Sequence, residues 1–178
     1  FDYVSDFTLN HFLFPNSSST QLAKLDDTKK LTTISAIANA MTSIHHANII
    51  HKHLSTSNIL IDNSLQPKLF DFGLTYMQNS DNNSNQILTI SPSNLAPEVI
   101  KNCQYSKASD VYSFGILVYE ILTSKCPYEK KSFYEVLFQV PQGLRPNLAD
   151  PNISPSFREL ISKCLSPNPN DRPTFEFI

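Results

Sequence analysis

The sequence contains a cluster of histidines that could do chemistry. They are His45, His46, His51 and His53. A neutral imidazole binds transition metals and, with an unperturbed pKa near ~6.5, also accepts protons well. We do not expect all four to meet at one metal ion, because His45 and His46 should end a helix while His51 should turn inward against Phe72. His53 could accept a proton, and the simpler interpretation is that it fills a turn.

Asn58 and Asp71 form a second group of interest, made of one amide and one carboxylate. Oxygen atoms of these types are the ligands that Mg²⁺ prefers, so the two side chains could hold metal ions if they project from one hairpin. Simpler interpretations are a turn-stabilising amide for Asn58 and a capping or turn aspartate for Asp71. The glycine of the following Phe72-Gly73 favours a functional Asp71, because it lets the next loop swing.

The elements that would position these residues are a hairpin and several helices. Two extended runs, 59–61 and 67–70, are separated by the turn-prone Asp62-Asn63-Ser64 and predict a small hairpin. From Asp26 to Ala47 a helical stripe predicts a helix packed on a core. The apolar residues of that stripe are Leu31, Ile34, Ile37, Ala38, Met41 and Ile44.

Three further helices follow in the second half of the chain. Residues 109–123 are apolar around most of the circumference, which predicts a helix buried in the middle of a bundle. Two amphipathic helices fit residues 132–140 and 155–165, the second with Ser154 as its cap before Pro155.

Composition indicates one globular unit of 178 residues, with 40% hydrophobic residues and a net charge of −2. The arginines are scattered, so we expect no nucleic-acid partner. The most apolar stretch, 111–122, contains a serine and a glutamate and is too short to span a membrane. The polar tract 78–86 has no apolar residue to bury, and we predict that residues 75–90 are disordered or weakly ordered without a partner.

The three cysteines are widely spaced, which favours reduced thiols over disulfides or a zinc site. We expect them to behave as buried small hydrophobic residues. They are Cys103, Cys126 and Cys164.

Several short motifs occur in a fixed order along the chain. They are H-K-H-L-S-T-S-N at 51–58, D-F-G at 71–73, A-P-E at 96–98, S-D-V-Y-S-F-G at 109–115 and D-R-P at 171–173. This order resembles the catalytic half of a eukaryotic protein kinase, and the fourth motif is most similar to the tyrosine-kinase-like group. The resemblance implies a protein kinase-like α+β fold. Residues 1–178 would be its hinge and mainly α-helical C-lobe, with a small β-hairpin that carries the catalytic loop and D-F-G.

The resemblance also implies roles for individual residues. Asn58 and Asp71 would hold Mg²⁺, while Asp2, Val4 and Leu60 would contact ATP. Glu98 and Arg172 would form a buried bidentate pair that ties the segment after the mobile loop to the helical core. Asp110 would accept N–H bonds from the turn at 51–53.

The sequence departs from the family pattern at the catalytic positions. His53 stands where an aspartate would accept the substrate proton, and Ser55 stands where a lysine would stabilise the transferring phosphate. Lys52 replaces the arginine that would grip a phosphorylated loop. Ile90 and Asn94 replace the usual glycine and aromatic residue of the substrate-docking segment.

The sequence holds only three glycines, no two of them close, so it contains no glycine-rich phosphate loop. The strand lysine of the family is also missing, and we expect an N-lobe to lie upstream of this segment. The sequence therefore predicts a pseudokinase that acts as an interaction or allosteric module with other signalling proteins in the cytoplasm. The alternative is an active ATP-dependent serine/threonine kinase whose base has been replaced.

Overall fold

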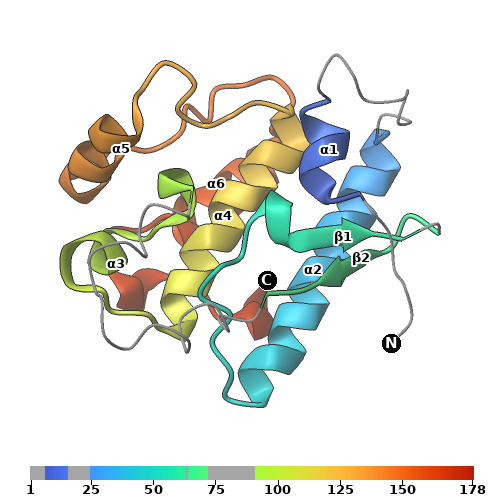
Figure 1. Cartoon of the computed structure of the whole chain (residues 1–178), viewed down its shortest axis with the longest axis horizontal. Helices are drawn as coiled ribbons and strands as arrows, with labels where there is room; N and C mark the ends of the chain where they lie inside the picture. Colours follow the sequence, from blue (N-terminus) through green and yellow to red (C-terminus); the bar gives the residue numbers. More distant parts are fainter. Residues whose placement is uncertain (1–6, 16–24, 63, 72–90) are drawn as a thin grey trace.

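The computed structural model describes residues 7–15, 25–62, 64–71 and 91–178 (Figure 1). It confirms a mainly helical architecture with one small antiparallel sheet. The hinge residues Asp2 and Val4 and the tract 75–90 lie outside the described residues. The helices and strands are α1 Leu9–Leu13, α2 Asp27–His46, β1 Ile59–Ile61, β2 Pro67–Leu69, α3 Pro97–Asn102, α4 Lys107–Thr123, α5 Phe133–Gln139 and α6 Pro155–Cys164. Short 3₁₀ turns connect them, namely η1 Thr56–Asn58, η4 Pro92–Asn94, η5 Val140–Gln142, η6 Pro169–Asp171 and η7 Phe175–Phe177.

Helix α4 is the centre of the core, as its apolar sequence predicts. Every residue from Ser109 to Thr123 is buried, and α2 and α6 pack against this helix (Figure 1). It begins earlier than predicted, at Lys107, because the Ser106 side chain accepts a hydrogen bond from the Ser109 N–H and so caps the helix. Gly115 lets α6 approach closely, since a Cβ there would lie 2.8 Å from the Cβ of Cys164.

Helix α2 confirms the predicted stripe for most of its length. Asp26 caps the helix by accepting a hydrogen bond from the Lys29 N–H, and Ile34, Ile37 and Met41 are buried.

Leu31 is an exception to this stripe, because 47% of its surface is exposed. It lines an open groove together with Phe157 and Leu160 of α6 instead of packing inside the core. Thr33 and His45, which are polar, are buried on α2.

The predicted hairpin is present between β1 and β2. Ile59 pairs with Leu69 and Ile61 with Pro67. The Asp62 carboxylate closes the turn by accepting the N–H groups of Ser64 and Gln66, at 2.9 Å each.

The two C-terminal helices also follow the prediction. Ser132 and Ser154 cap α5 and α6, and α6 has Pro155 in its first turn. Helix α5 lies at one side of the molecule (Figure 1) and contributes the buried Val136 to the core.

The prediction of buried cysteines is wrong for two of the three. Cys164 is buried, but Cys103 and Cys126 are exposed. Cys103 is the C-cap of α3 with a φ of 54°, so it lies where the chain leaves the helix at the surface. Cys126 follows the end of α4 in a connecting segment, and such segments run over the protein surface.

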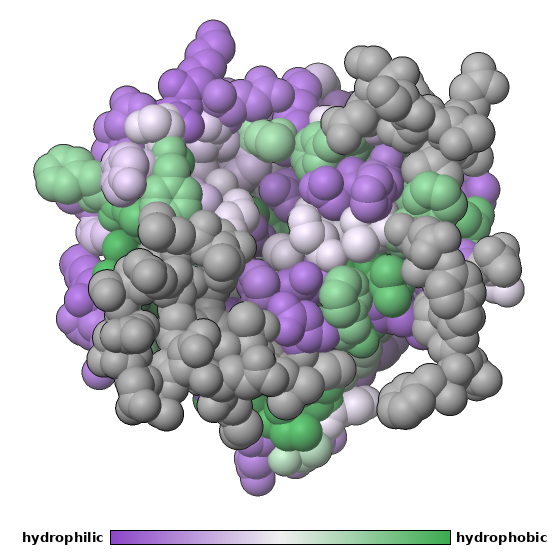
Figure 2. Space-filling model, in the orientation of Figure 1, coloured by the Kyte–Doolittle hydropathy of each residue, from purple (hydrophilic) through white to green (hydrophobic). Residues whose placement is uncertain are grey.

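Among the described residues, no helix combines the length and the apolarity needed to cross a membrane. Hydrophobic side chains on the face shown in Figure 2 form separate areas between hydrophilic ones. The larger hydrophobic side chains that are most exposed are Tyr134, Phe138 and Phe177.

Candidate functional site

The hairpin brings Asn58 and Asp71 together, as the sequence predicts. Asn58 immediately precedes β1 and Asp71 follows β2, and antiparallel pairing places these two points at the same end of the sheet. The Phe70 N–H donates to the Asn58 carbonyl at 3.2 Å. The side chains meet as well, because Asn58 Nδ2 lies 3.5 Å from Asp71 Oδ2.

His53 joins this pair through a contact that the sequence analysis did not predict. Its Nδ1 lies 2.7 Å from Asp71 Oδ2, and the exposed fractions of the two side chains are 17% and 24%. An ionised carboxylate only accepts hydrogen bonds, so the imidazole donates through Nδ1–H. The side-chain rotamers that make this contact are set by the fold, and sequence spacing carries no signal for them.

Asn58 is held by the same turn. Its Nδ2 donates to the His53 carbonyl at 2.8 Å, and the residue is buried. Because the amide nitrogen is engaged in this way, the amide oxygen Oδ1 is the atom that can ligate a cation. His53, Asn58 and Asp71 therefore form one constellation of imidazole, amide and carboxylate.

Asp110 of α4 fixes the turn that carries His53. Its carboxylate accepts the N–H of His51 at 2.8 Å and the N–H of Lys52 at 2.9 Å, which confirms the predicted role. It also bonds His45 Nε2 at 2.9 Å, a contact that was not predicted.

Two residues of the site have an unusual backbone conformation. The φ angle of Lys52 is 68° and that of Asp71 is 60°. These values lie in the left-handed region, which non-glycine residues occupy at some cost in free energy.

His51 and Ser55 are both buried beneath the turn. Burial lowers the pKa of His51, and the nearby Asp110 carboxylate partly offsets this effect. The imidazole of His51 is therefore held largely neutral, which suits a packing role.

Glu120 of α4 is a further buried group near the site that sequence reasoning missed. It lies close to Thr56, and burial raises the pKa of its carboxyl group to about 8. Glu120 is 7% exposed. The only signal in the sequence was that a glutamate interrupts the apolar stretch 111–122.

Glu98 and Arg172 form the predicted bidentate pair. Arg172 Nη1 donates to Glu98 Oε1 at 2.6 Å, and Nη2 donates to Oε2 at 2.9 Å. The same guanidinium donates to the carbonyls of Ser166 and Ala108. Arg172 is buried and Glu98 is nearly so, so the pair ties α3 to the C-terminal segment of the chain.

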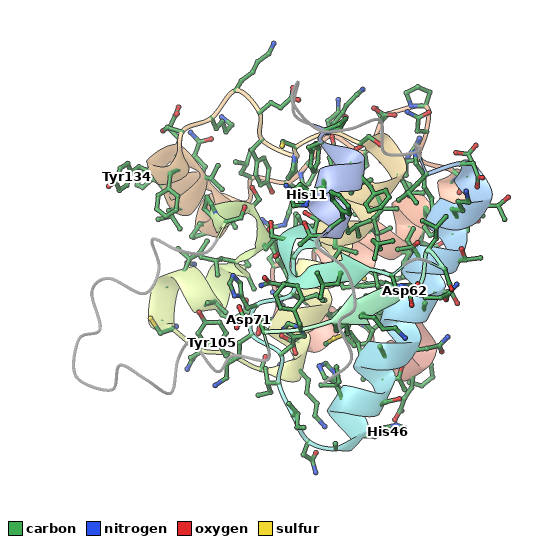
Figure 3. All side chains as sticks on the ribbon, turned by 45° about the vertical axis from the view of Figure 1, so that its right-hand side comes forward. His11, His46, Asp62, Asp71, Tyr105 and Tyr134 are labelled. Carbon is green, nitrogen blue, oxygen red and sulfur yellow. The ribbon has the colours of Figure 1, made fainter. Side chains whose placement is uncertain are left out.

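The other residues predicted for the site lie as follows. Leu60 of β1 is partly exposed, whereas its neighbours Ile59 and Ile61 face the core. His46 bonds Glu176 at the end of α2, far from Asp71 (Figure 3). In the part of the chain that the structure describes, no three His, Cys, Asp or Glu side chains gather in a way that could hold a metal ion.

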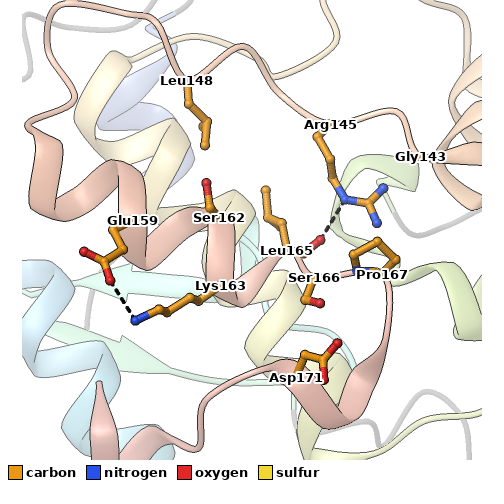
Figure 4. A pocket seen from close by; sticks show the side chains of 10 residues that line it. All are labelled: Gly143, Arg145, Leu148, Glu159, Ser162, Lys163, Leu165, Ser166, Pro167 and Asp171. Carbon is orange, nitrogen blue, oxygen red and sulfur yellow. Dashed lines mark hydrogen bonds and ion pairs between the residues drawn. The ribbon is translucent and has the colours of Figure 1, made fainter.

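A separate cavity of about 490 Å³ lies between α6 and the segment from Gly143 to Leu148 (Figure 4). Three of its four charged side chains are engaged by neighbours, because Lys163 pairs with Glu159 at 2.8 Å and Arg145 Nε donates to the Leu165 carbonyl at 2.8 Å. We therefore do not regard it as the functional site.

A family model and several curated relatives are similar to this chain in sequence. The model of the protein tyrosine and serine/threonine kinase family matches residues 1–178. A probable serine/threonine-protein kinase of Dictyostelium discoideum is 36% identical over 91% of this chain and 12% of its own length. The dual specificity protein kinase shkD of the same organism is 36% identical over 73% of this chain and 18% of its own length.

A third relative is the serine/threonine-protein kinase ppk11 of Schizosaccharomyces pombe, which is 32% identical over 80% of this chain and 46% of its own length. The chain thus spans less than half the length of each of these relatives. The match over all 178 residues shows that this chain belongs to the protein tyrosine and serine/threonine kinase family.

Proposed function

We propose that the chain is the C-lobe of a pseudokinase, which acts through interaction or allosteric signalling instead of phosphoryl transfer. The observation that carries this proposal is the 2.7 Å contact between His53 Nδ1 and Asp71 Oδ2. In kinase catalysis an aspartate at the position of His53 accepts the proton of the substrate hydroxyl. Here the Nδ1 of the imidazole is directed at Asp71, so this nitrogen is not open to a hydroxyl.

The lack of positive charge supports the same proposal. Ser55 stands where serine/threonine kinases place a lysine, and it is buried and uncharged. A transferring phosphate is stabilised by fixed positive charge, so this loss lowers the capacity for catalysis. Lys52 has a single ammonium group in place of the planar guanidinium of arginine. It therefore cannot form two parallel hydrogen bonds to a phosphate on the loop, and would bind a phosphorylated loop less tightly.

We propose that ATP with Mg²⁺ binds weakly at this site. Asn58 Oδ1 and the Asp71 carboxylate suit Mg²⁺, because both are oxygen ligands and the two side chains lie 3.5 Å apart. A bound metal ion would neutralise charge on the phosphates. Leu60 is partly exposed, which would allow its side chain to contact a nucleotide. Asp2 and Val4 would make the remaining contacts with the nucleotide.

The alternative is an active serine/threonine kinase. It is favoured by the convergence of Asn58 and Asp71, by the intact pair of Glu98 and Arg172, and by relatives that are named as serine/threonine-protein kinases. We place the chain in the tyrosine-kinase-like group on its S-D-V-Y-S-F-G motif. We expect a cytoplasmic location with other signalling proteins as partners.

The decisive experiment compares phosphate transfer by the full-length protein with transfer by a repaired variant. We expect wild-type transfer from ATP to protein to stay near background. Replacing His53→Asp and Ser55→Lys together returns a proton acceptor and a positive charge, and should raise the rate by roughly 10²–10⁴-fold. Incorporation of labelled phosphate measures both rates.

Ser57→Lys is the matched control, because it adds the same charge at an exposed neighbouring position and should leave the rate unchanged. Robust, metal-dependent transfer by the wild-type protein that disappears in Asp71→Ala would instead establish the active-kinase alternative.

A further inference from the structure

We infer that His53 is itself a metal ligand, and that it changes the selectivity of the Asn58–Asp71 site from Mg²⁺ towards a divalent transition ion such as Mn²⁺. The inference rests on the proposed function only in its assignment of Asn58 and Asp71 as metal ligands. It concerns which ion binds, whatever the rate of phosphate transfer.

The geometry supports a shared ion. His53 Nδ1 lies 2.7 Å from Asp71 Oδ2, and the amide of Asn58 lies 3.5 Å from the same oxygen. With metal–ligand distances of about 2.1 Å, neighbouring ligand atoms in octahedral or tetrahedral sites lie roughly 3.0–3.4 Å apart. The two ligand atoms His53 Nδ1 and Asp71 Oδ2, at 2.7 Å, lie slightly closer than this range, so a small side-chain movement would admit an ion between them. The Asn58 Nδ2 contact at 3.5 Å places the amide beside the pair, from where its Oδ1 would be the third ligand.

The site is also held in place and open to solvent. The Asn58 nitrogen is fixed by the His53 carbonyl at 2.8 Å, and Asp110 fixes the turn through two backbone N–H groups. The side chains of His53 and Asp71 are 17% and 24% exposed, which leaves an entry path. Positioned ligands of this kind need little rearrangement to bind an ion.

Ligand chemistry decides which ion is favoured. Mg²⁺ binds oxygen ligands almost exclusively, whereas imidazole suits the ions of Fe, Ni, Cu and Zn. Mn²⁺ also favours oxygen ligands and is the weakest binder of the first-row transition ions, so it gives the most stringent test of a contribution from the imidazole. Binding requires only a change of tautomer, in which the Nδ1 proton is given up and Nε2 carries the proton, so that the neutral imidazole presents its Nδ1 lone pair to the ion. A carboxylate at position 53 would instead restore an all-oxygen site.

The test uses MnCl₂ and MgCl₂ with the full-length protein and no nucleotide. Electron paramagnetic resonance of Mn²⁺ gives its affinity, competition gives the Mn²⁺/Mg²⁺ ratio, and pulsed measurements detect a directly bound ¹⁴N nucleus. We expect a ¹⁴N signal in the wild type. His53→Asp should remove that signal and lower the Mn²⁺/Mg²⁺ ratio by roughly tenfold or more.

His46→Asn is the matched control, since it removes an exposed imidazole at the far end of α2 and should change neither result. The inference is overturned if the wild type lacks the ¹⁴N signal or if His53→Asp keeps the wild-type ratio. It is also overturned if His53→Ala tightens Mn²⁺ and Mg²⁺ equally, since the imidazole would then be a competitor. Phosphate-transfer rates do not enter these outcomes, so failure here leaves the pseudokinase proposal to its own test.

Discussion

Asp110 and Glu120 are two buried carboxyl groups on the same helix, and their surroundings differ. Asp110 accepts hydrogen bonds from two backbone N–H groups and bonds the ring of His45. Within the described residues, Glu120 Oε2 has no hydrogen-bond partner. A carboxylate surrounded by donors organises a loop, whereas a buried carboxyl group with little support is held in its neutral form.

This difference predicts that stability depends on pH through Glu120. Burial raises its pKa from 4.5 to about 8 in the folded protein, so the folded state binds the proton more tightly than the unfolded state. Stability should therefore fall as the pH rises from the unfolded pKa to the folded one, and remain low above it.

Glu120→Gln should abolish this loss and make the protein more stable than wild type at pH 9, with little difference near pH 4. Chemical denaturation at several pH values measures the effect. Equal pH dependence in the two proteins would show that Glu120 ionises without penalty. Glu129→Gln, at an exposed position, is the control.

At the scale of elements, helix α4 depends on the small size of Gly115. A methyl group there would lie 2.8 Å from Cys164 Cβ and 3.0 Å from Leu165 Cδ2. Gly115→Ala should thus destabilise the protein by roughly 1–3 kcal/mol through overpacking, although alanine is the better helix former.

Urea denaturation measures this change, with Ser162→Ala on the exposed face of α6 as a control. A gain in stability for Gly115→Ala would mean that α6 moves away without cost.

The hairpin and the helices α2, α4, α5 and α6 were predictable because hydrophobic period and capping residues act locally, whereas the short helices α1 and α3 were not predicted. The stripe on α2, the caps Ser132 and Ser154 and the turn at Asp62 each left a signal in neighbouring residues. No such local signal exists for the exposure of Leu31 or for the contact of His53 with Asp71, because both depend on which distant segments pack together. In the candidate site, the resemblance identified the residues and the hairpin predicted their convergence, while the rotamers came only from the fold.

At the scale of the whole molecule, the pair of Glu98 and Arg172 joins segments that are 74 residues apart in the sequence. Its guanidinium also bonds the carbonyls of Ser166 and Ala108, so one side chain holds α3, α4 and the C-terminal segment together. Removing one partner of such a pair leaves the other charge buried and unpaired.

Arg172→Ala should therefore destabilise the protein by on the order of 3–5 kcal/mol. A thermal melt measures the loss, and Lys163→Ala, which breaks the exposed pair with Glu159, should leave the melting temperature nearly unchanged. An unchanged melting temperature for Arg172→Ala would exclude a structural role for the pair.

The ring of Tyr112 lies between two guanidinium groups, with Arg145 Cζ at 5.3 Å and Arg172 Cζ at 5.2 Å from its centroid. Cations bind most strongly to the face of an indole, and this chain contains no tryptophan. Tyr112→Trp would thus place the only tryptophan of this sequence against the guanidinium that also holds Glu98. The fluorescence emission of this tryptophan would then report on changes around the pair of Glu98 and Arg172. It could be measured without an added dye while nucleotides, metals or other proteins are titrated into the sample.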